Sequence, residues 1–210
     1  MELNKIIKYL IYSDLVFYTG WGIISPIFAI FILQSISGGN AFVVGIAAAV
    51  HLIVRSLLRI PFGIKADKSQ KVSYKFMLWG LLIAALVPLG YIISKNAWHI
   101  YIFQAVLGAS LAMSTAGWTC IFSRHMDRGK ESTEWGVDAV AVGLGPGIAA
   151  AAGGIAVTYF PFNSVFIIVT LMGLIGVLLL LFVKKDIIKH KDGKSAIFTH
   201  REIRRLKKGS

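Results

Sequence analysis

Charged residues, acids and cysteine are all scarce in this chain. Only 15% of its 210 residues are Asp, Glu, Lys or Arg, against about 25% in an ordinary soluble domain. A single cysteine, Cys120, excludes disulfides within the chain, and no CxxC or Cys/His spacing typical of a metal site occurs. Metalloprotease and serine-hydrolase motifs are absent, and no apolar run holds two acids. We therefore expect no metal, no cofactor and no enzymatic activity.

Long apolar runs dominate the sequence instead. The chain is 56% hydrophobic and its mean hydropathy is +0.72. A helix needs roughly 20 apolar residues to cross a bilayer, and six candidate runs lie at residues 10–32, 41–62, 76–93, 101–122, 137–160 and 164–183. We expect an all-α integral membrane protein, with a six-helix transmembrane domain at residues 1–184 and a basic cytoplasmic tail at residues 185–210.

Basic residues are concentrated on one side of the expected membrane. Nineteen Lys and Arg lie at the N-terminus, after the second and fourth spans and in the tail, whereas the other side has Lys95 alone. The positive-inside rule therefore predicts a multi-pass protein of the cell (inner) membrane with both termini in the cytoplasm. The bases are not interleaved with aromatics on a soluble face, so we expect the lipid bilayer, and no nucleic acid, as a partner. Residues 195–206 of the tail are either solvated or form a short amphipathic helix on the lipid surface.

Polar and aromatic residues of the first span share one helical face. They are Asp14, Tyr18, Trp21 and Ser25. An ionisable residue within a span is a functional candidate for which a partner is expected. Because Asp14 lies only about two turns from the cytoplasmic end of the helix, it has either a coupling role or a hydrated structural role.

The second span carries a stripe of three bases, His51, Arg55 and Arg59, spaced four residues apart. We expect Arg55 to lie at the depth of Asp14 on the neighbouring antiparallel helix and to form an ion pair with it. Such a pair either fixes helix packing or exchanges partners or protons during a conformational cycle. His51 is either a hydrogen-bonded packing residue or a group that titrates near neutral pH.

Small and polar residues mark the fourth and fifth spans. One face of the fourth span favours either close helix contact or a cavity wall; it carries Gln104, Gly108, Thr115 and Thr119, with Trp118 beside them. The fifth span predicts either a moving helix interface or static tight packing, because of Gly143, Gly145, Pro146, Gly147, Gly153 and Gly154. The third and sixth spans hold no ionisable residue, and we expect them to face lipid.

The connection after the second span carries a recognisable motif. Residues 63–71 read GIKADKSQK, which resembles the Gly-x-x-x-Asp-Arg/Lys-x-Gly-x-Arg/Lys loop of the major facilitator superfamily. The matching residues are Gly63, Asp67, Lys68 and Lys71, and Gln70 stands where the family has its second glycine. In the family this loop latches the cytoplasmic side of one half against the other, so the resemblance implies a cytoplasmic gate motif.

Two further stretches carry the same resemblance. Residues 143–154 resemble a glycine-proline motif of the family's exporters, and residues 124–131 resemble the basic-acidic stretch that leads into the family's fifth span. Drug/proton antiporters of the family commonly carry an arginine early in span four, where this chain has Gln104. The resemblance implies one six-helix half of the family's twelve-helix fold, built as a 3+3 inverted repeat.

A single half leaves the polar faces of its spans without cover. A C2 homodimer would supply the second half, with span two of one copy packed on span five of the other. Asp67 and its neighbouring bases would then face Glu131, Glu134 or Asp138 of the other copy. A heteromeric partner, or truncation of a longer natural sequence, would also account for the half-length pattern.

The resemblance implies a transporter that moves small solutes by alternating access. The span-five motif favours export, and coupling of transport to an ion is a separate expectation. The expected coupling groups are Asp14, Arg55 and His51. The expected substrate cavity comprises Tyr18, Trp21, Ser25, Gln104, Thr115 and Trp118, and the glycines and proline of span five form the inter-half motif. The alternative is a non-transporting accessory or assembly subunit that pairs with another membrane protein.

Overall fold

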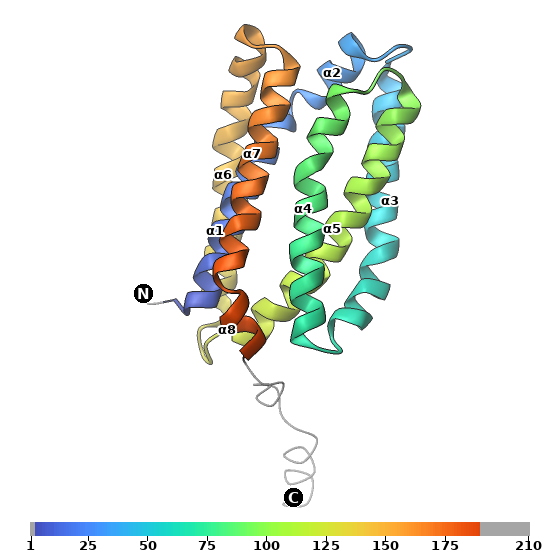
Figure 1. Ribbon diagram of the computed structural model, residues 1–210. Coiled ribbons are helices and arrows are strands. Elements are labelled where there is room, and N and C mark those ends of the chain that lie inside the picture. Colours follow the sequence, from blue (N-terminus) through green and yellow to red (C-terminus); the bar gives the residue numbers. More distant parts are fainter. Residues whose placement is uncertain (1–2, 190–210) are drawn as a thin grey trace, which may run out of the picture.

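The computed structural model describes residues 3–189, and this range is almost entirely helical (Figure 1). Residues 195–206 of the tail, for which a solvated segment and an amphipathic helix were both considered, lie outside the described residues. The helices, in chain order, are α1 (Lys5–Ile24), α2 (Phe28–Ser35), α3 (Ala41–Ala66), α4 (Gln70–Ile92), α5 (Ala97–His125), α6 (Glu131–Tyr159), α7 (Phe162–Phe182) and α8 (Lys184–Lys189).

Side chains that precede four of the long helices fix where those helices begin. Asn4, Asn40 and Asn96 accept hydrogen bonds from backbone N–H groups of the first turns of α1, α3 and α5, at 3.0, 3.0 and 3.3 Å. Ser69 does the same for α4 at 3.3 Å. Each bond satisfies a donor that has no partner within its helix. The connections between spans can therefore be short without leaving these helix ends unpaired.

The first span is bent and is not one straight helix. α1 ends at Ile24 and α2 begins at Phe28, and the two axes differ by 42°. Pro26 lies in the break, where it removes a backbone donor and its ring would clash with the preceding turn of a continuous helix. The bent pair has the length and hydropathy of one span, which together with α3 to α7 gives the predicted six crossings.

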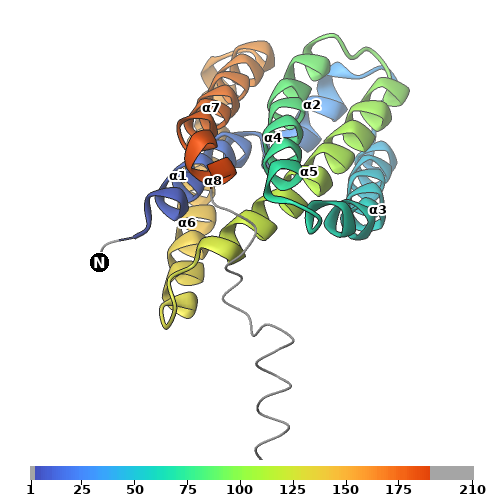
Figure 2. The same ribbon diagram turned by 60° about the horizontal axis from the view of Figure 1, so that its bottom comes forward.

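Neighbour relations divide the six spans into two groups of three (Figures 1 and 2). α1 packs against α6 and α7, α5 packs against α3 and α4, and α4 and α7 join the groups. Exchanging α1 with α5, α3 with α6 and α4 with α7 leaves all of these relations unchanged. This is the pattern that two structurally equivalent three-helix repeats produce, and it agrees with the predicted half of a major-facilitator-type fold.

Glycine brings helices of each group into close contact. A Cβ at Gly80 of α4 would lie 2.5 Å from the carbonyl oxygen of Ser110 on α5, and a Cβ at Gly22 of α1 would lie 2.5 Å from Pro146 on α6. Such distances leave no room for any side chain, so these positions require glycine. Small residues at contact points are the usual means by which membrane helices approach each other closely.

The expectation that the third and sixth spans face lipid is only half right. In the most apolar windows of α4 and α7, 50% and 44% of residues are buried within the chain, against 11% in both α3 and α6. α4 and α7 each pack on two other spans, whereas α3 and α6 each have one main neighbour. A span without ionisable residues can build the protein core as readily as it can contact lipid. The helices that this chain leaves most uncovered are α3 and α6.

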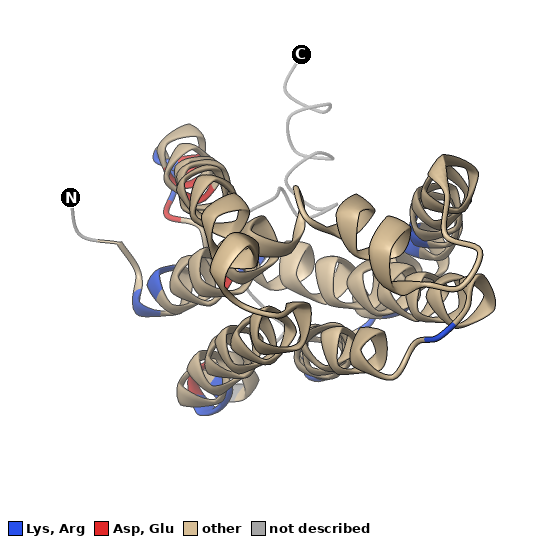
Figure 3. Ribbon diagram, turned by 90° about the horizontal axis from the view of Figure 1, so that it is seen from above, with Lys and Arg blue, Asp and Glu red and all other residues tan. Residues whose placement is uncertain are grey.

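The connections that carry bases lie together at one end of the bundle. The N-terminal end of α1, the α3–α4 and α5–α6 connections and α8 lie at the bottom in Figure 1. Lys5 and Asp186, both at this end, form an ion pair at 2.8 Å. Lys95 lies in the α4–α5 connection at the opposite end, and in the view from that end charged residues are few (Figure 3). The charge asymmetry of the sequence is thus an asymmetry between the two ends of the described structure.

Candidate functional site

Two neighbouring cavities lie along the inner faces of α1 and α5. The first has a volume of about 400 Å³ and is lined mainly by apolar residues. Five of the residues singled out from the sequence meet there: Tyr18, Trp21, Ser25, His51 and Gln104. The structure thus brings together residues from three spans, and four of them belong to the six that were expected in the substrate cavity.

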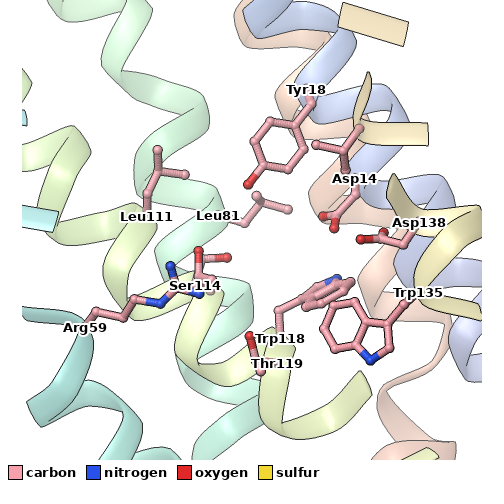
Figure 4. A pocket seen from close by; sticks show the side chains of 12 residues that line it. Asp14, Tyr18, Arg59, Leu81, Leu111, Ser114, Trp118, Thr119, Trp135 and Asp138 are labelled. Atoms are coloured by element: carbon pink, nitrogen blue, oxygen red, sulfur yellow. The ribbon is translucent and has the colours of Figure 1, made fainter. Parts of the chain in front are cut away.

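The second cavity lies nearer the charged end and has a volume of about 250 Å³. Its walls include Asp14, Tyr18, Thr115 and Trp118, which the sequence analysis had singled out, together with Arg59 of the basic stripe (Figure 4). Tyr18 and Leu111 line both cavities, so the two are adjacent. The expected substrate residues are therefore divided between an apolar cavity and a charged one.

The predicted ion pair between Asp14 and Arg55 is wrong. Arg55 lies beside the hydroxyl group of Tyr18, and no ion pair joins it to Asp14 among the residues that the structure describes. The reason is helix adjacency: α1 packs on α6 and α7, and α3 packs on α5, although α1 and α3 belong to consecutive spans. The charged neighbour of Asp14 is Asp138 on α6.

Asp138 is a residue whose place in the site the sequence analysis missed. It stands at the start of the fifth apolar run, and its carboxyl group points toward that of Asp14 (Figure 4). Asp14 and Asp138 are only 9% and 8% exposed, and Oδ1 of Asp138 has no hydrogen-bond partner in the described structure. The signal that could have found the pair is depth, because both aspartates lie two to three turns from the charged ends of their helices.

The indole rings of Trp118 and Trp135 lie beneath the two carboxyl groups (Figure 4), and both pack on Phe122. Trp118 stacks on Phe122 with ring centroids 4.5 Å apart, and Trp135 lies 4.8 Å from Phe122 and 5.7 Å from Trp118. Trp135, which the sequence analysis did not select, precedes Asp138 by three residues and shares its helical face. The indole N–H of Trp118 is buried without a hydrogen-bond partner. The floor of the charged cavity is thus aromatic and holds an unpaired donor.

The basic stripe of α3 faces α5, where a glycine allows close contact. A Cβ at Gly108 would lie 2.5 Å from the carbonyl oxygen of His51 and 3.2 Å from the backbone nitrogen of Arg55. The His51 ring reaches the backbone of Gln104, while its Nδ1 has no hydrogen-bond partner in the described structure. The stripe therefore contributes His51 to the apolar cavity and Arg59 to the charged one.

The candidate gate motif is mostly helical. Gly63 belongs to the last turn of α3 and Lys71 to the first turn of α4, which leaves only residues 67–69 between the two helices. Arg124, at the end of α5, donates a hydrogen bond to the carbonyl oxygen of Asp67 at 2.9 Å. The hydroxyl of Ser73 donates to the carbonyl oxygen of Ala66 at 2.7 Å. The motif is therefore anchored to its own half by backbone carbonyls, which leaves the Asp67 carboxyl group out of these bonds.

The glycine-proline stretch of α6 has two different faces. A Cβ at Gly145 would meet Thr19 of α1, a Cβ at Gly153 would meet Ile23, and Pro146 lies against Gly22. By contrast, a Cβ at Gly143, Gly147 or Gly154 would meet nothing within 4 Å. One face thus provides tight packing inside the chain, and the other is a small-residue surface that the chain leaves open.

Comparisons with known proteins identify the family. The sequence profile of the Major Facilitator Superfamily matches residues 11–208. The chain belongs to the major facilitator superfamily. Among curated proteins, a search finds no significant match.

Solved transporters of the major facilitator fold resemble this chain. A crystal structure of a POT peptide transporter, a mutant in complex with sulfate, superposes with a TM-score of 0.72 and 11% identity. The POT family transporter PepTSo, solved in meso, gives a TM-score of 0.70 and 11% identity. The alignments cover 96% and 93% of this chain but only 42% and 40% of those transporters. The chain therefore spans about two fifths of their length, with the fold of one half.

Proposed function

We propose that this major facilitator protein is a secondary transporter that moves small solutes across the membrane by alternating access. The observation that carries the proposal is the pair of adjacent cavities, which bring two buried aspartates together with bases and aromatic side chains inside a transporter fold. Ionisable groups inside a membrane domain are costly to bury, and they usually mark substrate or ion pathways. In this proposal Tyr18, which lines both cavities, contacts the solute.

Charged and titratable groups in and beside the cavities are the proposed coupling machinery. Asp14 is the coupling residue, and Arg55 and His51 are charged or titratable neighbours on the facing helix α3. The exporter-like glycine-proline stretch of α6 supports outward transport from the cytoplasm. The clustering of bases at one end of the structure supports cytoplasmic termini in the cell membrane.

The working unit that we propose is a C2 homodimer. α3 and α6 expose large apolar side chains, among them Leu57, Ile60 and Ile148, each at least 70% exposed in the single chain. The open glycines Gly143, Gly147 and Gly154 lie on the same helix as Ile148 and permit another helix to approach α6 closely. A second copy would cover both surfaces at once, because a twofold axis sets α3 of each copy against α6 of the other.

The same uncovered surfaces support the alternative, a non-transporting accessory subunit that pairs with another membrane protein. The two proposals differ in whether copies of this chain bind each other. Leu57 on α3 and Val140 on α6 are each nine residues from the charged end of their helix and are exposed. In the homodimer they should therefore lie at the same depth on facing helices.

Cysteine cross-linking in native-like bilayers tests the homodimer. In a Cys120→Ser background, the double variant Leu57→Cys with Val140→Cys should form disulfide-linked dimers. The matched control is Ile175→Cys on α7, which is also exposed but lies on neither surface, and it should remain monomeric. Monomers in both samples, together with co-purification of a different membrane protein, would favour the accessory subunit.

Transport itself is tested in proteoliposomes that contain the full chain. A panel of small polar and amphipathic solutes is offered, and uptake is compared with that of empty vesicles. We expect uptake of at least one solute, driven by an ion gradient and lost in the Asp14→Asn variant. Uptake that Asp14→Asn leaves unchanged would remove Asp14 from the coupling role.

A further inference from the structure

The paired aspartates of the charged cavity have no counter-ion close by. Neither Asp14 nor Asp138 takes part in an ion pair in the part of the chain that the structure describes, and each lies within electrostatic reach of the other. Both are more than nine-tenths buried, Oδ1 of Asp138 has no hydrogen-bond partner in the described structure, and both residues line the cavity. Two buried carboxyl groups that face each other repel when ionised, and this repulsion is relieved by a positive charge between them.

The aromatic floor beneath the carboxyl groups favours one kind of positive charge. The faces of Trp118 and Trp135 attract cations, and indole is the strongest of the aromatic side chains in this respect. Tyr18 closes the opposite side of the aspartates, as Figure 4 shows. Carboxyl groups together with aromatic rings are the combination that recognises organic ammonium groups.

Arg59 gives the charged cavity a basic side opposite its two aspartates. Its guanidinium group lies on the far wall, beside Ser114 and away from the two aspartates (Figure 4). It does not pair with either aspartate in the described structure, so the acid end of the cavity keeps its attraction for a cation. No group of three or more His, Cys, Asp or Glu that could hold a metal ion exists among the described residues. The acid end therefore offers two carboxyl groups and two indoles, which suit an organic cation better than a metal.

We infer that Asp14, Asp138, Trp118 and Trp135 form a binding site for a small organic cation with an ammonium head group. The cavity volume of about 250 Å³ accommodates such a group but not a large molecule. Asp14 and Asp138 supply the charge, and the two indoles supply the surface on which the alkyl groups of the ammonium pack. This inference rests on the proposed transport function, for which it names a substrate class, and it adds Asp138 and Trp135 as specificity residues.

Equilibrium binding tests the site without requiring transport. The full chain in lipid nanodiscs is titrated with choline, and binding is measured by calorimetry. A parallel titration uses 3,3-dimethylbutan-1-ol, an isostere in which an uncharged carbon replaces the nitrogen of choline. We expect saturable binding of choline and none of the isostere at the same concentrations. Asp138→Asn and Asp14→Asn should each weaken choline binding at least roughly tenfold, because each removes one of the two attracting charges.

A matched pair of tryptophan variants and one charge variant separate effects on the site from general effects on the protein. Trp135→Leu should weaken choline binding roughly fivefold, as expected for loss of a cation–π contact. Trp79→Leu, which removes an exposed tryptophan on α4 outside the cavity, should change nothing. Arg59→Gln removes a positive charge from the same cavity and should strengthen choline binding.

The outcomes test the cation-binding site separately from the transport function. Equal binding of choline and its isostere, or unchanged affinity in both aspartate variants, overturns the cation site while leaving transport of other solutes intact. Choline binding that follows the predicted order of variants supports the site even if no flux is found. In that case the transport proposal fails alone, and the site belongs to a binding subunit.

Discussion

Asp14 on α1 and Asp138 on α6 face each other inside the charged cavity, although they belong to the first and fifth spans of the chain. The two aspartates lie near each other because α1 packs along α6, with Gly22 against Pro146 and Gly145 against Thr19. Two acids are thus held together by the close packing of small residues further along the same two helices. The arrangement opposes the electrostatic preference of the acids, which is typical of sites that are kept for function at some cost in stability.

The first prediction concerns the stability of this pair. Asp138→Asn keeps the shape of the side chain and removes a buried carboxylate that faces another, so we expect it to raise the free energy of unfolding by about 1 kcal/mol. The thermal unfolding midpoint in detergent measures the effect. Asp127→Asn, in the more exposed α5–α6 connection, serves as the control and should not stabilise the protein.

A second prediction follows from the mutual repulsion of the two aspartates. If each destabilises the fold through the other, then Asp14→Asn and Asp138→Asn should each relieve most of the repulsion. The double variant should therefore gain less stability than the sum of the single variants, with a coupling of about 0.5 kcal/mol or more. Strict additivity in the same unfolding assay would show that the two carboxyl groups do not interact.

A third prediction addresses the anchor between the gate motif and α5. Arg124 donates a hydrogen bond to the backbone carbonyl of Asp67, so Arg124→Gln should loosen the α3–α4 connection and cost about 1 kcal/mol of stability. Limited proteolysis within residues 67–69 should become faster. Arg128→Gln changes a nearby base outside this bond and should behave like the unaltered protein; equal proteolysis of both variants would contradict the anchor.

The membrane class and the number of crossings could be predicted from the sequence because hydropathy is a strong signal that acts along the chain, and the three-helix repeat followed from the family resemblance. Sequence reasoning failed where the answer depends on which spans pack together. The predicted pair of Asp14 and Arg55 assumes that consecutive spans are neighbours, whereas the fold sets α1 beside α6. Pro26 is a local signal for the break in the first span, because proline removes a backbone donor and interrupts a helix.

For the expected substrate residues, too, the sequence predicts which side chains share a helical face, but it does not predict which helices face one another. Helical spacing grouped Tyr18, Trp21 and Ser25 correctly on one face. It could not show that Gln104 joins them, or that Trp118 lies in the second cavity with Trp135. Those facts depend on the relative depth and rotation of α1, α5 and α6, which the sequence of a single chain does not encode in any short pattern.

The two faces of α6 provide the last prediction, which uses a matched pair of glycines two residues apart. Gly145 faces Thr19 and Leu15 of α1, whereas a Cβ at Gly147 meets nothing within 4 Å. Gly145→Leu should overpack the α1–α6 contact and lower the stability of the single chain by about 1–3 kcal/mol. Gly147→Leu should leave the unfolding midpoint of detergent-solubilised monomer unchanged.

In a bilayer, the Gly147→Leu variant should affect a second property, the fraction of the protein that is dimeric. If the open face of α6 packs on α3 of a second copy, Gly147→Leu should reduce the dimer fraction, because a bulky side chain keeps the two helices apart. Native mass spectrometry from nanodiscs measures that fraction, and Gly136→Leu, at an open position near the start of α6, tests whether any exposed leucine has the same effect. A Gly147→Leu chain that unfolds as easily as Gly145→Leu would show that this face is already packed within one chain. A stable Gly147→Leu chain with an undiminished dimer fraction would instead place the dimer contact on another surface.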